Sequence, residues 1–525
     1  MRIRALALTL LVACAVAVPA TAHASPSPEP VLALTTSGPV SGLREGLVNE
    51  FRGIPYAAPP VGELRWRAPR PVRPWLLPRS ATAYASPCAQ RAGEQQLAGS
   101  SEDCLYLNVT TPRSGPSRKP VMVWIHGGGN FQGAGSTYDP RRMAERGDVV
   151  VVTINYRVGA FGFLSHPGLE GSGTFGLQDQ QAALRWVRRN AALFGGDSRN
   201  VTVFGESAGG VDICGQLTSP ASNGLFDKAI LQSGSCLTRV PTFATPQDGA
   251  VHLVKDDFWA PLSAREPVGV RVAEELGCGT VSCLRLLPTA KLLPYDSSFG
   301  IATGTPTLPR DPGSALRAGA FHRVPVLSGN TRDEARLTTM FVEALTGPIT
   351  RERYAQLLLD TFGADAPAIE RRYPADDSAA KNALTLASLD TDRVFACAQQ
   401  ETTRLLARRT AAYGFEFADR TAPTFSPFFT ELPPGASHAS ELAYLFKLLD
   451  GAPYGPNLKH VELTAAQRRL GDAMIDAWTR FAHTGRPGWP KAPYVQAFGQ
   501  RIEPIDATRV HKCDLWDHTP SAVVR

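Results

Sequence analysis

One ten-residue segment, Val201 to Gly210 (VTVFGESAGG), constrains the fold of this chain more than any other. Its first four residues are β-branched or aromatic and predict a buried strand, and a helix-compatible stretch follows. This order of strand, sharp turn and helix is typical of a nucleophile elbow, which holds a serine hydroxyl at the carboxyl end of a strand. We expect glycine to be required at 205 and 209, because a Cβ at Gly205 or Gly209 would collide with the neighbouring strand or helix. Ser207 is therefore the candidate nucleophile.

A second glycine-rich motif lies upstream of Ser207. The apolar run from Lys119 to His126 predicts another buried strand, and it ends in His-Gly-Gly-Gly. Consecutive glycines leave backbone N–H groups unobstructed, so this loop can direct two of them toward a developing oxyanion. The amide of Ala208 is the expected third donor, and each such donor contributes ~2.7–4 kcal/mol of transition-state stabilisation. The alternative is a flexible turn after a strand, but the two motifs in this order favour a hydrolase.

The N-terminal residues predict export from the cell. A basic start (Arg2 and Arg4) precedes an apolar run from Ala5 to Val18, and small residues follow. This pattern is typical of a secretory signal peptide, residues 1–24, so we expect a secreted protein. The sequence around Cys14 also resembles a lipoprotein processing box, but the apolar stretch continues past it, which disfavours a lipid anchor.

Beyond the signal, residues 25–525 contain neither an internal repeat nor a linker that would divide them, and we expect a single domain. Continuous apolar strands that alternate with helices predict an α/β fold with a large, mostly parallel sheet covered on both faces. Strands are expected at residues 121–125, 149–156, 200–204, 228–232, 324–328 and 412–417, and helices at residues 178–194 and 464–483. Residues 237–267 are irregular and form either a surface loop or an excursion that gates the mouth of the site.

Charge and cysteine content argue against several classes of function. The formal net charge is +6, the two arginines of the signal peptide included, and no Lys/Arg block points to nucleic acid. No other segment is apolar enough to span a membrane. Of nine cysteines, those other than Cys14 are even in number, which in an exported chain favours disulfides over metal ligands. We therefore expect no metal site and no cofactor, and spacing alone does not pair the cysteines.

A serine nucleophile needs a base. In folds built around a nucleophile elbow, the catalytic residues follow one another along the chain as nucleophile, acid and histidine. The histidines downstream of Ser207 are His252, His322, His438, His460, His483, His511 and His518. His252 and His322 leave little chain between themselves and Ser207 for an acid-bearing strand. His460 is expected in a surface turn, His483 at a helix end, and His511 and His518 in the C-terminal tail. His438 lies in a loop of small residues that follows a predicted strand, so it is the favoured base.

The acid is expected where the predicted strand at 324–328 runs into a polar turn. That turn carries two adjacent carboxylates, Asp333 and Glu334. The acid would hold His438 in the correct tautomer and stabilise its imidazolium. The residues alone do not choose between the two, and a solvated acidic pair at a helix start is the alternative.

Several further motifs together resemble one family. Phe51 to Pro60 with Arg65-Trp66 resembles an N-terminal block of the type B carboxylesterases, and Ser101 to Val109 (SEDCLYLNV) is among their most specific signatures. Gly176 to Val187, with Phe194 to Asp197, leads into the elbow as it does in that family. The chain thus resembles the branch of the α/β-hydrolases that also holds the cholinesterases, over nearly its whole length after the signal.

The resemblance implies a site and an activity. It implies Glu334 as the acid, His438 as the base, and Gly128, Gly129 and Ala208 as oxyanion donors. It implies a serine carboxylesterase that acts on small-molecule esters without a cofactor. It also implies the disulfides Cys88–Cys104, Cys397–Cys513, Cys278–Cys283 and Cys214–Cys236.

The chain departs from the family pattern at several positions. Ala335 and Ala439 replace glycines that usually follow the acid and the histidine, and an alanine would be strained there if the position needed a positive φ. Thr174 replaces an asparagine. The loop from Ala89 to Asp103 has no aromatic residue, whereas cholinesterases place a tryptophan there to bind a quaternary ammonium, which argues against choline esters. A lipase or polyester-active esterase, and a non-catalytic recognition homologue, are the alternatives.

Overall fold

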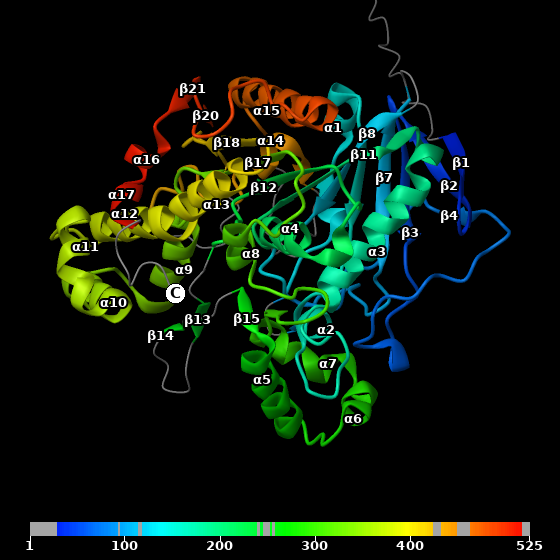
Figure 1. Cartoon of the computed structure of the whole chain (residues 1–525), viewed down its shortest axis with the longest axis horizontal. Coiled ribbons are helices and arrows are strands. Elements are labelled where there is room, and N and C mark those ends of the chain that lie inside the picture. Colours follow the sequence, from blue (N-terminus) through cyan, green and yellow to red (C-terminus); the bar gives the residue numbers. More distant parts are fainter. Residues whose placement is uncertain are drawn as a thin grey trace, which may run out of the picture.

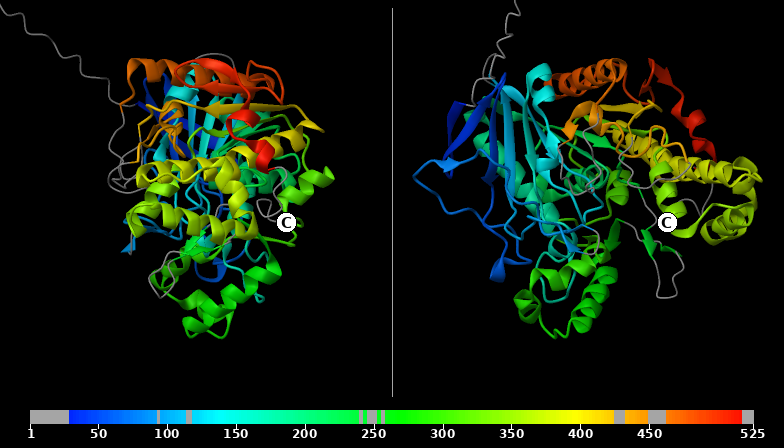
Figure 2. Two further views of the ribbon diagram at one scale, coloured as in Figure 1. Left: turned by 90° about the vertical axis from the view of Figure 1, so that its left-hand side faces the viewer. Right: turned by 180° about the vertical axis from the view of Figure 1, so that it is seen from behind.

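The computed structural model describes residues 29–92, 95–113, 118–238, 242–244, 252–254, 258–423, 432–448 and 462–516. The predicted signal peptide, Cys14, His460 and His518 lie outside the described residues. Within them, the chain forms an α/β fold around one large sheet, as Figures 1 and 2 show.

The central sheet has 13 strands in the order β1-β2-β3-β7-β10-β8-β11-β12-β17-β18-β20-β21, with β4 beside β2. The strands from β10 to β20 run parallel, and antiparallel strands extend the sheet at both edges. The prediction of a mostly parallel sheet is confirmed. The strands are β1 (Glu29–Thr35), β2 (Gly38–Glu45), β3 (Val48–Pro55), β4 (Arg79–Ser80), β7 (Tyr106–Pro112), β8 (Lys119–Ile125), β10 (Val150–Ile154), β11 (Gly196–Glu206), β12 (Lys228–Gln232), β17 (Val326–Thr331), β18 (Ala412–Phe417), β20 (Val495–Phe498) and β21 (Ile502–Ile505).

Helices cover both faces of this sheet (Figure 1). On one face lie α1 (Arg141–Gly147), α14 (Leu442–Leu445) and α15 (Ala465–Thr484), and on the other α3 (Phe175–Asn190), α4 (Ala208–Thr218), α8 (Pro312–Ala318) and α13 (Cys397–Ala407). Strand β8 shows why its sequence is apolar throughout. Met122 and Trp124 belong to one core, and Val121, Val123 and Ile125 belong to the other.

The helix predicted near residue 464 has the expected start. The Thr464 side chain accepts a hydrogen bond from the amide of Gln467, whose own side chain accepts one from the Thr464 amide. This capping box supplies partners that the first turn of a helix otherwise lacks. The helix predicted at 178–194 is α3, which begins three residues earlier and continues as a 3-10 turn over Ala191–Phe194.

The remaining elements gather around the edges of the sheet. Below it in Figure 1 lie α2 (Gly159–Phe163), α5 (Leu262–Glu275), α6 (Val281–Leu286) and α7 (Thr289–Leu292). Beside it lie α9 (Arg336–Thr346), α10 (Arg351–Phe362), α11 (Ala366–Arg372), α12 (Ala379–Asp390), the π-helix η7 (Thr391–Ala396), α16 (Ala507–Val510) and α17 (Cys513–Trp516). Several of these pack around a third, smaller core.

The stretch at 237–267 is less irregular than expected. Its described residues include β13 (Thr242–Ala244), paired with β14 (His252–Val254), and β15 (Trp259–Pro261), paired with β16 (Ile301–Thr303). Residues 262–267 belong to helix α5, and Pro267 lies inside it. Further two-stranded pairs are β9 (Tyr138–Asp139) with β19 (Lys447–Leu448), and β5 (Arg91–Ala92) with β6 (Gln95–Gln96). Among the described residues, no helix is both long and apolar enough to cross a membrane.

Candidate active site

Ser207 occupies a sharp turn between β11 and α4. Its backbone angles are φ 56° and ψ −124°, a strained combination for a residue with a Cβ. The Ser207 amide donates to the carbonyl of Gln232, at 2.9 Å, and its carbonyl accepts from Val211. A Cβ would lie 2.6 Å from the Ile125 carbonyl oxygen if placed on residue 205, and 2.1 Å if placed on residue 209. The elbow therefore depends on both glycines for the steric reason expected.

The glycine loop after β8 lies directly against this elbow. A Cβ on Gly127 would be 3.0 Å from the Cβ of Ser207. Gly128 and Gly129 have φ values of 101° and 62°, which side chains disfavour. Ala208 is the first residue of α4, so its amide has no carbonyl one turn earlier in the helix. The structure thus places Ala208 directly after the serine and the start of the glycine loop, at Gly127, against it.

The loop after β17 places Glu334, rather than Asp333, at His438. Glu334 Oε2 lies 2.6 Å from His438 Nδ1, and Glu334 Oε1 accepts from the Thr331 amide at 2.7 Å. The Asp333 carboxylate instead accepts two bonds of 2.9 Å from Arg420 and one from the Ala436 amide. Glu334 therefore contacts a histidine, whereas the neighbouring Asp333 contacts an arginine.

His438 sits in a crowded, charged environment. Its Nε2 lies 3.2 Å from Glu206 Oε1, and its ring packs against that of Phe395, with 5.3 Å between centroids. Burial lowers the pKa of His438, but the carboxylates of Glu206 and Glu334 outweigh this effect and raise it. Burial raises the pKa of Glu206, and burial together with Glu334 raises that of Glu441. An imidazolium at His438 is therefore stabilised from two sides.

No hydrogen bond joins Ser207 Oγ to His438 among those of the described residues, because Nε2 faces Glu206. Catalytic hydrogen bonds are often long or misaligned without substrate. The sequence predicted the three residues but not the close contact of His438 with Glu206. The position of Glu441, whose carboxylate accepts from Gln232, was missed because it follows His438 in a loop with no periodic pattern.

The two alanines that replace family glycines differ in strain. Ala335 has φ −78°, an ordinary value, so it fits without cost. Ala439, next to His438, has φ 67° and lies in the left-handed region that favours glycine. Strain from the substitution is therefore confined to the histidine loop.

Other histidines have structural contacts. Nε2 of His322 lies 2.7 Å from the Ser219 carbonyl oxygen, and Nε2 of His483 lies 2.9 Å from that of Gly147. His511 was expected in the C-terminal tail, and the structure shows that this part of the tail packs into the fold. The His511 side chain is buried, and both ring nitrogens contact carboxylates.

The structure contains the four disulfides that the resemblance implies: Cys88–Cys104, Cys214–Cys236, Cys278–Cys283 and Cys397–Cys513. Across the described part of the chain, no cluster of His, Cys, Asp or Glu could hold a metal ion.

A serine elbow beneath a glycine loop, on a large and mostly parallel sheet, defines an α/β-hydrolase. The chain belongs to the carboxylesterase family, whose model matches residues 28–510. It is 35% identical over 481 residues to the para-nitrobenzyl esterase of Bacillus subtilis, covering 87% of this chain and 92% of the relative. It is 36% identical over 512 residues to the fumonisin B1 esterase of Sphingopyxis macrogoltabida, covering 89% and 86%. A solved structure of PNB esterase superimposes with a TM-score of 0.73 at 31% identity, covering 92% of this chain and 99% of the other. The protein is a carboxylic ester hydrolase, as the motifs predicted.

Proposed function

We propose that this protein is a secreted serine carboxylesterase that works through an acyl-enzyme on Ser207. The observation that carries the proposal is the 2.6 Å contact between Glu334 and His438, next to a serine held at a strained elbow. Oxygen-rich partners on both sides of the imidazole favour its charged form, which a general base must adopt during the reaction.

The first half-reaction forms the acyl-enzyme. Ser207 Oγ attacks the ester carbonyl while His438 Nε2 takes the hydroxyl proton. The carbonyl oxygen becomes an oxyanion and accepts hydrogen bonds from the amides of Gly128, Gly129 and Ala208. The C–O bond to the alcohol then breaks, and the alcohol leaves with the proton from His438. Glu334 keeps Nδ1 protonated throughout, so that Nε2 is free to accept.

The second half-reaction repeats these roles with water. Water gives a proton to His438 and attacks the acyl carbon, and the acid product leaves as Ser207 recovers its proton. For either step His438 Nε2 must turn from Glu206 toward Ser207 Oγ. Glu206 then remains close enough to stabilise the imidazolium, since the two groups lie 3.2 Å apart before the turn.

The test is hydrolysis of p-nitrophenyl esters from acetate to palmitate by the wild type, Ser207→Ala and Ser314→Ala. Ser314 is exposed at the start of α8 and serves as a matched control. We expect turnover of short esters to fall by roughly 10⁴-fold or more in the Ser207 variant only, because its nucleophile is gone. Equal rates in wild type and Ser207→Ala would refute the assignment and favour a non-catalytic homologue. A rate maximum at long acyl chains would instead identify a lipase.

Secretion has a separate test. The four disulfides are compatible with an oxidising compartment. We expect the protein in the culture medium, with a mature N-terminus at Ser25 by intact-mass analysis. A lipid-modified N-terminal cysteine at position 14 in the membrane fraction would establish the lipoprotein alternative, and an intact residue 1 in the cytoplasm would refute export.

A further inference from the structure

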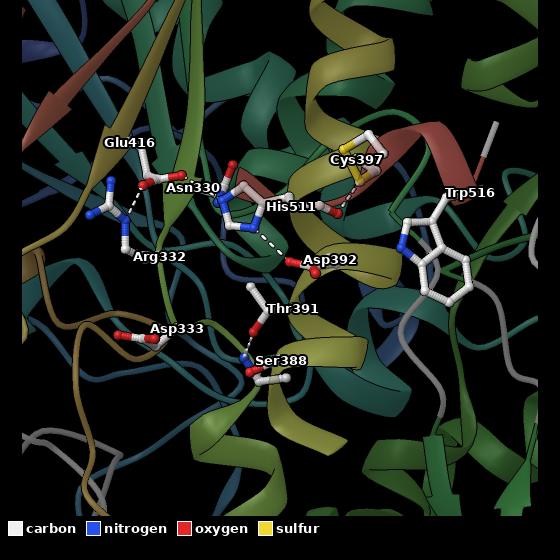
Figure 3. A network of polar contacts seen from close by, with 12 residues as sticks. Asn330, Arg332, Asp333, Ser388, Thr391, Asp392, Cys397, Glu416, His511 and Trp516 are labelled. Carbon is white, nitrogen blue, oxygen red and sulfur yellow. Dashed lines mark hydrogen bonds and ion pairs between the residues drawn. A yellow bond between two sulfur atoms is a disulfide. The ribbon is translucent and has the colours of Figure 1, made fainter. Parts of the chain in front are cut away.

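A buried histidine lies away from the candidate active site, between two carboxylates. His511 Nδ1 is 2.6 Å from Asp392 Oδ1, and His511 Nε2 is 2.6 Å from Glu416 Oε2 (Figure 3). The three side chains are 3%, 6% and 2% exposed, respectively. Neutral imidazole has one N–H, so two carboxylate contacts require both nitrogens to be protonated or one acid to carry the proton.

The surrounding groups favour the charged imidazole. Burial lowers the pKa of His511, but hydrogen bonds and charge from Asp392 and Glu416 raise it to about 9. Arg332 adds a second cation beside Glu416, and the Tyr373 hydroxyl donates to Asp392 at 2.7 Å. A buried histidine cation thus joins two buried anions that would otherwise lack a common partner.

One side of this network reaches the residues just before Glu334. Glu416 Oε1 accepts from Arg332 Nε at 2.5 Å, and the Arg332 amide donates to the Phe417 carbonyl. The residue before Arg332 is Thr331, whose amide donates to Glu334 Oε1 at 2.7 Å. Glu416 therefore holds the strand end that supplies one of the two hydrogen bonds of the Glu334 carboxylate.

The other side reaches the residue just after Glu334. Asp392 belongs to the π-helix η7, and its neighbour Thr391 accepts, through Oγ1, from the amide of Ala335 at 3.0 Å. The same π-helix carries Phe395, which packs against the ring of His438. Asp392 therefore holds the element that contacts both the acid loop and the histidine.

We propose that His511 is a positioning residue for ester hydrolysis, which ties Asp392 to Glu416 and thereby holds both sides of the loop that aims Glu334 at His438. The proposal rests on the proposed function of Glu334 and His438. The C-terminal segment is itself secured, since the Cys397–Cys513 disulfide ties α17 to α13. Without the His511 cation, the two carboxylates would face one another across a buried gap and repel, so both supports of the loop would shift.

The experiment compares His511→Gln with Tyr373→Phe. Both remove a hydrogen bond to Asp392, but only the first removes the cation that also holds Glu416. Active sites are counted by titration with a fluorophosphonate, so that kcat refers to folded, reactive enzyme. We expect kcat for p-nitrophenyl acetate to fall roughly 10- to 100-fold in His511→Gln, because small displacements of a catalytic group have effects of that order. In His511→Gln, KM should change less than about threefold, because the substrate contacts remain. In Tyr373→Phe, kcat should also change less than about threefold, because the His511 cation remains.

A pH profile separates positioning from general destabilisation. Glu334 raises the pKa of His438, so a misaligned Glu334 raises it less. The acid limb of kcat/KM should therefore move to lower pH in His511→Gln and stay in place in Tyr373→Phe. Wild-type kcat per titrated site in His511→Gln would overturn the proposal, and so would an equal loss in Tyr373→Phe.

A second variant covers the case in which His511→Gln does not fold. Arg332 is 25% exposed, so Arg332→Gln can be tolerated while it removes the link from Glu416 to the acid loop. The same fall in kcat at constant KM supports the network, and wild-type kcat refutes it. Ser207→Ala distinguishes failure of the proposed function from failure of the positioning role. If Ser207→Ala stays active, the proposed function is refuted. If Ser207→Ala is inactive but the His511 and Arg332 variants keep wild-type kcat, only the positioning role is refuted.

Discussion

Replacement of Glu334 by glutamine tests the candidate acid with almost no change in shape. The carboxylate uses both oxygens: Oε1 accepts from the Thr331 amide and Oε2 contacts His438 Nδ1. A glutamine has only one oxygen. If that oxygen stays on the Thr331 amide, the NH₂ group faces His438 and forces Nδ1 to accept, which puts the proton on Nε2. If the amide flips, two N–H groups confront each other at Thr331.

The first orientation is expected, because it satisfies every hydrogen bond. It leaves His438 in the tautomer that cannot take a proton from Ser207. Loss of the correct tautomer in a serine hydrolase lowers kcat by about 10⁴-fold, which corresponds to about 5.5 kcal/mol of transition-state stabilisation. Removal of the charge also lowers the pKa of His438, since Glu334 is one of the groups that raise it.

The assay is kcat on p-nitrophenyl acetate, with Asp333→Asn as the matched control. Asp333 is adjacent in the chain and also buried, but it is bonded to Arg420 and the Ala436 amide. We expect the control to lose stability while kcat stays within about tenfold of wild type, because no reacting group changes. A Glu334→Gln enzyme within tenfold of wild type, or a larger loss in Asp333→Asn, would refute the assignment of the acid.

Two further predictions concern stability. Ala439→Gly should raise the apparent Tm by about 1 °C, since relief of strain at φ 67° outweighs the flexibility of glycine by roughly 0.5–1 kcal/mol; an unchanged or lower Tm would contradict this. Loss of the Cys397–Cys513 disulfide, with a sequence separation of 116, should lower the free energy of unfolding in urea by about 4.8 kcal/mol on the chain-entropy model. Loss of Cys278–Cys283, with a separation of 5, should lower it by only about 2.1 kcal/mol, and equal losses would rule out loop closure as the main cause.

The fold could be predicted from local signals because the central strands are apolar on both faces. Residues 228–232 and 412–417 match β12 and β18 without adjustment. Strand β11 begins earlier than predicted, at Gly196, since Gly196 pairs with Lys119 of β8 ahead of an irregularity in register that ends at Val201. No local pattern reveals such an extension. It depends on the partner strand.

The candidate site could be located but not completed from the residues. The elbow and the glycine loop are local motifs, and their order in the chain pointed to Ser207 as the candidate nucleophile. The acid was ambiguous, because Asp333 and Glu334 differ only in the partners that reach them from about 90 to 100 residues away in the chain, Arg420 and His438. Only the fold brings those partners close.

The role of His511 also depends on partners that are distant in the sequence, although one local feature could have indicated it. Its acids lie 119 and 95 residues away, so nothing around position 511 predicts a buried cation. Glu416, however, stands alone among apolar residues in the strand Ala412–Phe417. A carboxylate in the middle of a buried parallel strand is too costly without a cation, so this strand alone predicts a buried basic partner. Two cations, Arg332 and His511, fill that role, and the geometry of the fold decides which of them also reaches Asp392.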